Sequence, residues 1–281
     1  MSNMSLISKI AYFILKKTKP TYMDSQEEVE LFLKTKKDKD FKTVFHTEYF
    51  ENVKLVSFND NSKSVILYIH GGAYVNQLNI QHLLYCFILS KLVKTSIVVP
   101  VYPLAPEHNY MESYELITKL YCDLIEKYEN ITLMGDSAGG GFVLSFCQYL
   151  KQIKVKQPNN IIVFSPWVDL SMENCVDDGD DPILGKVGLV EIAKSWADKT
   201  DTKNYKLSPL YGDNINLPRT LIITGTDEIF YPDIKRYYKK LVNSDVDAEL
   251  IEGEGLFHIY PLFPIPEAIN ILKKIKKEII K

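Results

Sequence analysis

Cysteine is scarce in this chain: its 281 residues include four, at Cys86, Cys122, Cys147 and Cys175. The four are scattered, with no CxxC pair and no spacing typical of metal ligands, which excludes a dense disulfide framework. Three of them lie in apolar or helical runs, where a cysteine is expected as a buried thiol. This cysteine usage suits a reducing compartment, and we expect the protein to be cytoplasmic.

A large charge of either sign is missing as well. Lysine and arginine number 33 against 36 aspartates and glutamates, which gives a net charge of −3. No basic face with interleaved aromatic residues stands out, so a nucleic-acid partner is excluded. The chain has no internal repeat and no low-complexity linker. Its length, with 46% hydrophobic residues, is enough for one sizeable core.

Long apolar runs are also absent. Near the N-terminus, the apolar stretch 10–15 lies between Lys9 and Lys16-Lys17, and it is much shorter than the about 20 residues of a transmembrane helix. A secretory signal would have a longer apolar region and a small-residue cleavage site. The apolar residues here share one helical face: Ile7, Ile10, Ala11 and Ile14. We expect an amphipathic helix that packs on this protein without stable membrane insertion, and reversible membrane contact is the alternative.

Short apolar runs, mostly rich in β-branched residues, alternate with helical patterns along most of the chain. The expected strands are 53–58, 64–69, 96–101, 131–134, 161–164, 220–224 and 248–251. The expected helices are 81–92, 111–128, 139–151, 232–242 and about 266–280. Such alternation predicts an α/β protein with a mostly parallel central sheet flanked by helices. The first two of these strands are candidates for an antiparallel edge.

The segment 171–206 interrupts this alternation. It carries an acidic run, Asp177 to Asp181, that lacks the regular ligand spacing of a calcium loop, so we expect a solvated loop and no metal. A helical stretch, 187–197, follows it. Residues 24–40 are rich in lysine and acidic residues and predict a solvated helix and loop. We expect a single domain over 1–281, with a helical cap contributed by about 1–40 and about 171–206.

One serine stands between small residues where an apolar run becomes a helical pattern. The run 131–134 is followed by Gly135-Asp136-Ser137-Ala138-Gly139-Gly140. A glycine-rich packing turn is one interpretation. The other is a nucleophile elbow, G-x-S-x-G, in which glycines remove Cβ atoms that would clash in a tight turn and the serine is exposed at the edge of the sheet.

A serine nucleophile needs a base, and the chain has five histidines: His46, His70, His82, His108 and His258. We expect His46 on an early strand and His82 in a helix, as packing or surface residues. In chains with this elbow on an α/β-hydrolase sheet, the order is serine, then acid, then histidine. His258 is the histidine that follows Ser137, so this order leaves it as the candidate base.

A second glycine-rich motif directly follows the expected strand 64–69. It reads His70-Gly71-Gly72-Ala73. Oxyanion stabilisation needs backbone N–H groups that approach the substrate closely, so small residues are required there. A plain Gly-Gly turn is the alternative. We expect His70 to hydrogen-bond this loop into shape and not to transfer protons.

Together, these motifs resemble the hormone-sensitive-lipase-like esterases of the α/β-hydrolase fold. The family's HGGG, GDSAGG and Y-R-L-A-P-E correspond to segments 70–73, 135–140 and 102–107, and its S-P-W-x-D-L and later S-P to 165–170 and 208–209. The resemblance runs from about Val65 to Tyr260. It implies oxyanion donors at the N–H groups of Gly72, Ala73 and Ala138.

Two positions depart from the family pattern. Ala73 replaces the third glycine; its N–H remains available, but an alanine is comfortable only at negative φ. Pro103 replaces an arginine, which leaves Asp136 and Glu107 without that cation.

Two adjacent carboxylates, Asp227 and Glu228, follow the expected strand 220–224. Aspartate is the commoner acid in such triads, but the family pattern G-x-x-[DE], counted from Gly225, reaches Glu228. The interval to His258 is 258 − 228 = 30, which resembles the family's spacing. We favour Glu228 as the acid over Asp227, with Asp233 as the next candidate.

The resemblance implies a serine hydrolase that cleaves carboxylic esters with short to medium acyl chains through an acyl-enzyme. Ser137, His258 and Glu228 are its expected catalytic residues, its partner is a small-molecule ester, and it requires no metal or cofactor. Tyr74, Tyr110 and Trp167 are candidates for an aromatic pocket or for packing. An amidase or peptidase of the same fold and a non-catalytic small-molecule receptor are the alternatives, and a homodimer is left open.

Overall fold

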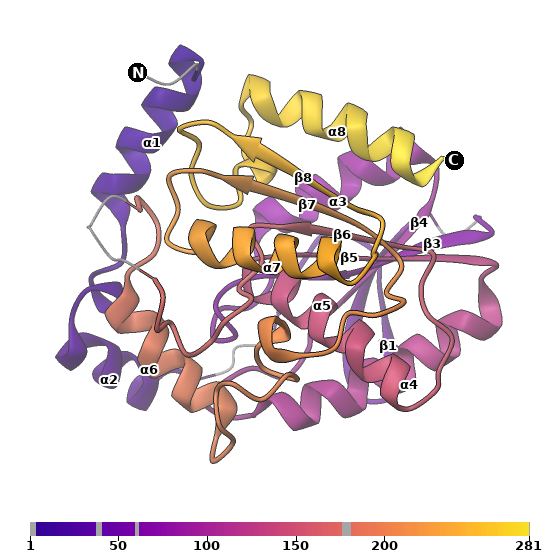
Figure 1. Cartoon of the computed structure of the whole chain (residues 1–281), viewed down its shortest axis with the longest axis horizontal. Helices are drawn as coiled ribbons and strands as arrows, with labels where there is room; N and C mark the ends of the chain where they lie inside the picture. Colours follow the sequence, from indigo (N-terminus) through magenta and orange to yellow (C-terminus); the bar gives the residue numbers. More distant parts are fainter. Residues whose placement is uncertain (1–3, 38–40, 60–61, 176–180, 281) are drawn as a thin grey trace.

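The computed structural model describes residues 4–37, 41–59, 62–175 and 181–280. Within them, eight strands form one sheet in the order β1-β2-β4-β3-β5-β6-β7-β8 (Figure 1). The strands are β1 (Thr47–Phe50), β2 (Val53–Phe58), β3 (Ser64–Ile69), β4 (Ser96–Pro100), β5 (Asn130–Asp136), β6 (Asn160–Phe164), β7 (Arg219–Gly225) and β8 (Ala248–Gly253). Every neighbouring pair from β4 to β8 is parallel. The predicted α/β class with a mostly parallel sheet is confirmed.

The antiparallel edge differs from the expected one. β2 is antiparallel to β4 as well as to β1, but β3, expected as its edge partner, lies inside the sheet and is parallel to both β4 and β5. The outer antiparallel strand is β1, which has only four residues and exposes Tyr49. A strand this short and polar leaves no apolar pattern in the sequence. His46, expected on a strand, is exposed and lies just before β1.

Helices cover both faces of the sheet. They are α1 (Leu6–Thr18), α2 (Gln26–Thr35), α3 (Ile80–Val93), α4 (Tyr110–Lys127), α5 (Ser137–Gln152), α6 (Lys186–Ala197), α7 (Tyr231–Asn243) and α8 (Pro266–Ile279), with 3₁₀ turns η1 (Thr21–Met23), η2 (Pro209–Tyr211) and η3 (Tyr260–Leu262). Successive side chains of β3 enter different clusters: Leu67 belongs to the one that also holds apolar residues of α4, α5 and α7, whereas Ile66 belongs to the one with residues of α3 and α8. The core is therefore two apolar layers separated by the sheet.

The interrupting segment and the N-terminal segment meet in space. α2 and η1 pack on α6 (Figure 1). The contact is close at Gly188, where an added Cβ would lie 2.7 Å from both the Met23 Cα and the Tyr22 backbone oxygen. α2 is less solvated than expected, since Val29 is fully buried in the core. The solvated helix and loop were expected over 24–40, and residues 38–40 of that range lie outside the described residues.

Helix α1 packs through a different face from the expected one. Ala11 faces the core as predicted, but its partners there are Met4, Tyr12 and Leu15, whereas Ile7, Ile10 and Ile14 are about half exposed. Polar contacts fix this rotation: Glu267, in the first turn of α8, accepts hydrogen bonds from the Ser5 N–H at 2.7 Å and the Ser8 hydroxyl at 2.6 Å. Apolar periodicity alone could not show which of two apolar faces would dock.

The cysteines are free, and Cys86, Cys147 and Cys175 are buried. Burial raises the pKa of the Cys147 and Cys175 thiols. Among the helices in the described part of the chain, none is long and apolar enough to cross a membrane.

β3 and α5 approach each other most closely at Gly139. A Cβ added there would lie 2.1 Å from the backbone oxygen of Ile69 and 2.5 Å from that of His70. At Gly140, the nearest atom to an added Cβ would be the Pro166 Cβ at 3.1 Å. A close backbone approach therefore requires a glycine at position 139. The requirement at Gly140, in the same helix, is much weaker.

We predict that Gly139→Ala lowers the free energy of unfolding by at least about 2 kcal/mol, because backbone oxygens of a central strand cannot move aside without disturbing the sheet. Gly140→Ala is the matched control, since both changes gain the same roughly 1 kcal/mol of helix propensity. Urea unfolding curves measure both variants. Equal stabilities for the two variants would contradict the close approach.

Candidate active site

Ser137 lies where β5 ends and α5 begins, at the carboxyl edge of the sheet. Its φ is +53°, in the left-handed region that most residues avoid. The sharp turn of the backbone places the Ser137 side chain at the start of the helix. The Trp167 N–H donates a 2.9 Å hydrogen bond to the Ser137 carbonyl and so fixes the turn. The strand-to-helix turn expected for a nucleophile elbow is present.

His258 reaches Ser137 across 121 residues of sequence. Its Nε2 lies 2.8 Å from the Ser137 Oγ, and both side chains are buried. His258 is in the loop after β8, and the next residue, Ile259, donates its N–H to the Ser165 Oγ at 2.9 Å. Ser165, in the S-P-W-V-D-L segment, therefore holds the loop that carries the histidine.

Of the candidate acids, Glu228 is the one beside His258. Its Oε2 lies 3.3 Å from His258 Nδ1, and the Thr224 hydroxyl donates to its Oε1 at 2.7 Å. Asp227 is exposed and accepts a hydrogen bond from Thr226. Asp233 is buried but forms an ion pair with Arg236. The carboxylate favoured from the sequence is the one that the fold places at the imidazole.

Charge around His258 changes its proton affinity. Burial by itself lowers the pKa of His258, but the hydrogen bond and charge of Glu228, together with the charges of Asp181 and Asp136, outweigh it and raise the pKa above 6.5. The buried Nδ1 and the Glu228 Oε2 face each other at 3.3 Å as an ion-pair contact, and within the described residues neither atom has a partner with hydrogen-bond geometry. The arrangement therefore stabilises an imidazolium ion next to Ser137.

The loop after β3 lies against the elbow. Asp136, the neighbour of Ser137, accepts the Gly71 N–H at 3.0 Å, and the Tyr74 hydroxyl donates to the Ala138 carbonyl at 2.7 Å. The Tyr102 segment holds the other side: the Tyr102 hydroxyl donates to the His70 carbonyl at 2.7 Å. The two glycine-rich motifs are thus joined into one unit.

Ala73 adopts a backbone conformation that its side chain was expected to avoid. Its φ is +54°, between Gly72 at +108° and Tyr74 at +60°. The 2.9 Å hydrogen bond from the Ala105 N–H to the Tyr74 carbonyl and the bond from Tyr74 to Ala138 hold the turn in this less comfortable conformation. The loop therefore carries local strain of order 1–3 kcal/mol at this residue.

His82 supplies the partner that Asp136 was expected to lack. Pro103 does leave the position without a cation, but His82 Nε2 lies 3.3 Å from the Asp136 Oδ2, and the Tyr68 hydroxyl donates to Oδ1 at 2.8 Å. Burial by itself raises the pKa of Asp136, and His82, Tyr68 and the Gly71 N–H together reverse this and lower it. His82 is buried as a packing residue, but its role as a carboxylate partner left no signal in the sequence. Glu107 is exposed.

His70 is buried at the start of the loop after β3. Its Nδ1 lies 2.7 Å from the Gly71 carbonyl, and its ring packs on Tyr102 with 4.5 Å between centroids. Burial lowers the pKa of His70 to about 4. The ring is therefore neutral at physiological pH, which fits the expectation that it shapes the loop.

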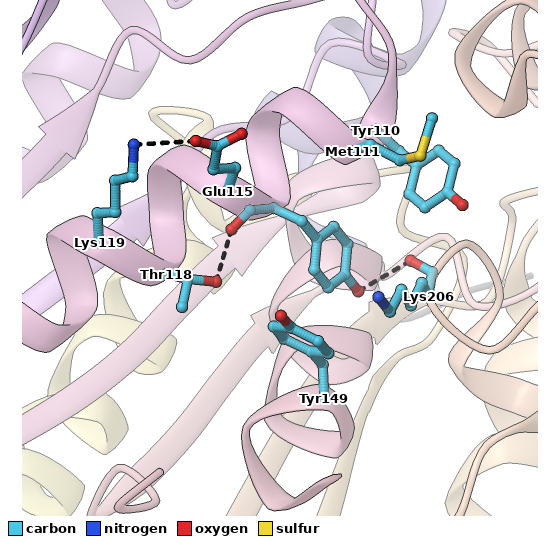
Figure 2. Close-up of a pocket in the computed structure, with 8 residues that line it drawn as sticks. Tyr110, Met111, Glu115, Thr118, Lys119, Tyr149 and Lys206 are labelled. Carbon is cyan, nitrogen blue, oxygen red and sulfur yellow. Dashed lines mark hydrogen bonds and ion pairs between the residues drawn. The ribbon is translucent and has the colours of Figure 1, made fainter. Parts of the chain in front are cut away.

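Of the three aromatic candidates, Tyr74 and Trp167 are packing residues, whereas Tyr110 lines a cleft. Tyr74 stacks on Trp196 of α6, with 4.5 Å between ring centroids, and on Trp167, so it links the loop after β3 to α6. Tyr110 bonds to Thr200 and lines a separate surface cleft of about 280 Å³ (Figure 2). Ser137, Glu228 and His258 do not line that cleft.

Asp181 was expected in a solvated loop, and that was wrong for this residue. It is buried, and its Oδ2 accepts the Ile229 N–H at 2.9 Å while its Oδ1 accepts those of Ile183 and Leu184. Burial raises the pKa of Asp181. Asp181 therefore ties the interrupting segment to the loop that carries Glu228. The rest of the acidic run, 177–180, lies outside the described residues.

Metal ligands do not gather in the described ranges: their His, Cys, Asp and Glu side chains form no group of three or more that could hold a metal ion.

The fold and this arrangement define an α/β hydrolase, and comparisons with known proteins agree. A family model described as the α/β-hydrolase fold matches residues 66–262. An esterase of Acinetobacter venetianus is 30% identical over 225 residues, which cover 76% of this chain and 74% of that protein. The chain belongs to the α/β-hydrolase family and is a carboxylesterase-like hydrolase; its motifs resemble those of the hormone-sensitive-lipase-like esterases.

Solved structures share this fold over nearly the whole chain. A candidate esterase of Staphylococcus aureus superposes with a TM-score of 0.87 at 25% identity, covering 95% of this chain and 99% of that one. An esterase from the bacterial hormone-sensitive lipase family superposes with a TM-score of 0.83 at 23% identity, covering 100% of this chain and 99% of that one. The N-terminal helices and the segment around α6 are therefore part of a shared architecture.

We predict that His82→Leu destabilises the fold by at least about 2 kcal/mol at pH 7, because it removes the partner of a buried carboxylate. The pKa of Asp136 is lowered in the folded state, so its ionised form stabilises the fold above about pH 3.8, the ordinary value. The difference between variant and wild type should therefore shrink as the pH falls below that value.

Urea unfolding at a series of pH values measures this difference. His46→Leu, at an exposed histidine, serves as the control and should stay within about 0.5 kcal/mol of wild type. A loss in His82→Leu that does not depend on pH would contradict the carboxylate pairing.

Proposed function

We propose that Ser137, His258 and Glu228 are the catalytic residues with which this hydrolase cleaves carboxylic esters of short to medium acyl chain length. The observation that carries the proposal is the 2.8 Å contact between Ser137 Oγ and His258 Nε2, with Glu228 on the opposite ring nitrogen at 3.3 Å. A serine, a base in hydrogen-bond reach and a buried carboxylate behind the base are the parts that acyl transfer needs.

The first half of the reaction acylates Ser137. His258 Nε2 takes the hydroxyl proton as Oγ bonds to the ester carbonyl carbon, and Glu228 stabilises the imidazolium that forms. The imidazolium then protonates the alkoxy oxygen, the carbon–oxygen bond to the alcohol breaks, and the acyl group stays on Oγ. Water repeats the sequence, losing a proton to His258 and releasing the carboxylic acid and Ser137.

The developing oxyanion needs fixed donors. We assign this role to the N–H groups of Gly72, Ala73 and Ala138. Ala138 is in the first turn of α5, where N–H groups have no partner within the helix, and the loop of Gly72 and Ala73 is tied to it through Tyr74. Loss of one such donor costs about 10²–10³ in rate in related chemistry.

The substrate range is part of the same proposal. We assign α2, η1 and α6 to a cap, since they pack together and α6 touches the oxyanion loop through the Trp196–Tyr74 stack. A series of p-nitrophenyl esters of increasing acyl length tests both activity and pocket length, and aminoacyl anilides test the amidase alternative. No turnover of any ester would support a non-catalytic receptor.

Location and assembly are also proposals. Four free cysteines fit a reducing cytoplasm. A homodimer stays a prediction, and light scattering on the purified chain measures it directly.

We expect Ser137→Ala to abolish covalent labelling by a fluorophosphonate, because the probe bonds to the activated Oγ. The fold should be retained, as the hydroxyl makes one side-chain contact, to His258. Intact-protein mass spectrometry measures the labelling, with circular dichroism as the folding control. Labelling retained in the variant would refute Ser137 as the nucleophile.

We expect Glu228→Gln to lower kcat by at least about 10², since the amide favours the wrong imidazole tautomer and withdraws the charge opposite the imidazolium. Asp227→Asn is the matched control: it removes the same charge from an adjacent, exposed carboxylate and should keep kcat near wild type. If Asp227→Asn were the more damaged variant, Asp227 would be the acid.

The pH profile gives a second readout of Glu228. Because His258 acts as a base only when neutral, kcat/KM of the wild type should rise with pH through a pKa above 6.5. In Glu228→Gln, the main cause that raises this pKa is gone and burial still lowers it, so the residual activity should rise at lower pH. An unchanged profile would show that Glu228 does not face the base.

A further inference from the structure

Helix α1 is apolar on two opposite sides. One side, with Ala11, Tyr12 and Leu15, packs on the core next to α8. The other side carries five large apolar residues that are 52% to 74% exposed: Leu6, Ile7, Ile10, Phe13 and Ile14. We call these five residues the α1 ridge. At 100° per residue, the ridge points almost directly away from the docked side, so no rotation of the helix could bury both.

A contiguous ridge of this kind on one helix indicates an interaction surface, because scattered exposed apolar residues are common but a patch is not. The helix that carries the ridge is positively charged. Within Leu6–Thr18 there are Lys9, Lys16 and Lys17 and no acidic residue, so the helix carries +3. Since the whole chain carries −3, the remainder is −3 − 3 = −6. The helix is therefore positive in a chain that is otherwise negative overall.

Two of the three lysines border the ridge, and the third lies along it. Lys9 and Lys16 are on one border of the ridge, and Lys17 Nζ lies 4.3 Å from the Phe13 ring centroid. Lysine stems of this kind cover apolar surface while the ammonium stays in the headgroup layer. A helix of 13 residues is about 20 Å long, too short for a hydrocarbon core of about 30 Å. It could only lie in the plane of an interface.

A second copy of this chain fits the ridge less well. In a twofold contact the ridge would face itself, and the lysines of both copies would be brought together without a carboxylate on either helix. An anionic bilayer offers apolar depth for the ridge and negative charge for its lysines at once.

The position of α1 adds a consequence. Tyr12, on the docked side, meets the ring of Phe257 edge-on at 6.5 Å between centroids, and Phe257 is the neighbour of His258. Figure 1 shows α1 at the edge of the molecule, beyond the carboxyl ends of β7 and β8. The ridge therefore faces away from the rest of the protein, on the same side as the carboxyl ends of the strands where the candidate site lies.

We propose that the α1 ridge docks this protein reversibly on an anionic lipid surface, with the helix lying in the plane of the headgroups. Docking brings the carboxyl edge of the sheet close to esters held in or released from that surface. This consequence for substrate supply rests on the proposed function, whereas the docking itself does not.

Co-sedimentation of the full chain with vesicles tests the docking. One set of vesicles contains equal parts phosphatidylglycerol and phosphatidylcholine, and the other is pure phosphatidylcholine. We expect binding to the first set that weakens with added salt, and little binding to the second. Equal binding to both sets, or none to either, would overturn the proposal.

A pair of double variants with the same charge change locates the surface. Ile10→Glu with Ile14→Glu should weaken binding at least about tenfold, because the ridge loses apolar contact and gains negative charge. Ile215→Glu with Val242→Glu, at residues 55% and 47% exposed elsewhere, is the matched control and should bind like wild type. If both double variants lost binding equally, the change in net charge alone would explain the loss, and the α1 ridge would not be the docking surface.

Further variants keep the test independent of folding and of catalysis. Lys9→Gln with Lys17→Gln leaves the apolar ridge intact and should weaken binding to anionic vesicles only. Ser137→Ala should bind vesicles like wild type, and the ridge variants should hydrolyse a soluble short-chain ester at the wild-type rate, so failure of the proposed catalysis and failure of docking are distinguishable. If light scattering shows a dimer that the Ile10→Glu, Ile14→Glu variant splits into monomers, a second copy occupies the ridge and the proposal is wrong.

Discussion

The buried carboxylate of Asp136 is the interaction on which the rest of the site depends. It precedes Ser137 in the elbow and accepts bonds from Tyr68 on β3 and from Gly71 in the loop after it, with His82 of α3 on its other oxygen. An ionised carboxylate in this interior would be costly without these three groups. Satisfying it therefore brings β3, the loop after β3 and α3 together at the end of β5, and the two glycine-rich motifs meet there.

Around this centre, the candidate site residues are held by partners from both nearby and distant segments. Ser165 holds the backbone next to His258, Thr224 orients Glu228, and Asp181 holds the backbone after Glu228. Ser165 follows β6, Thr224 is in β7, and Asp181 is in the interrupting segment. All three contacts lie at the same edge of the sheet. Positions of this kind decide whether reacting groups are held within the small tolerance that catalysis needs. The interrupting segment is thus a support of the candidate site.

The N-terminal helix shows how one element can serve two surfaces. Its polar contacts to Glu267 and its Tyr12 contact to Phe257 dock one apolar side, which leaves the other in water. A helix that is docked near the site by hydrogen bonds and packing, and has a second apolar side facing outward, can bind another surface through that second side. Such binding need not disturb the core. This arrangement connects the candidate site to whatever surface meets the helix.

Local patterns in the sequence determined the class of fold and the order of the chemistry. Alternating apolar runs and helical periods predict the parallel sheet, because period and propensity are properties of neighbouring residues. The elbow at Ser137 and the single later histidine, His258, are likewise local or ordinal features. What the tertiary structure decided is pairing at long range: His82 with Asp136, Asp181 with Ile229, β1 with β2, the docked side of α1 and the left-handed backbone of Ala73. None of these follows from periodicity, since each depends on which surfaces come into contact once the sheet has formed, and buried polar groups then take whichever partners lie within hydrogen-bond reach.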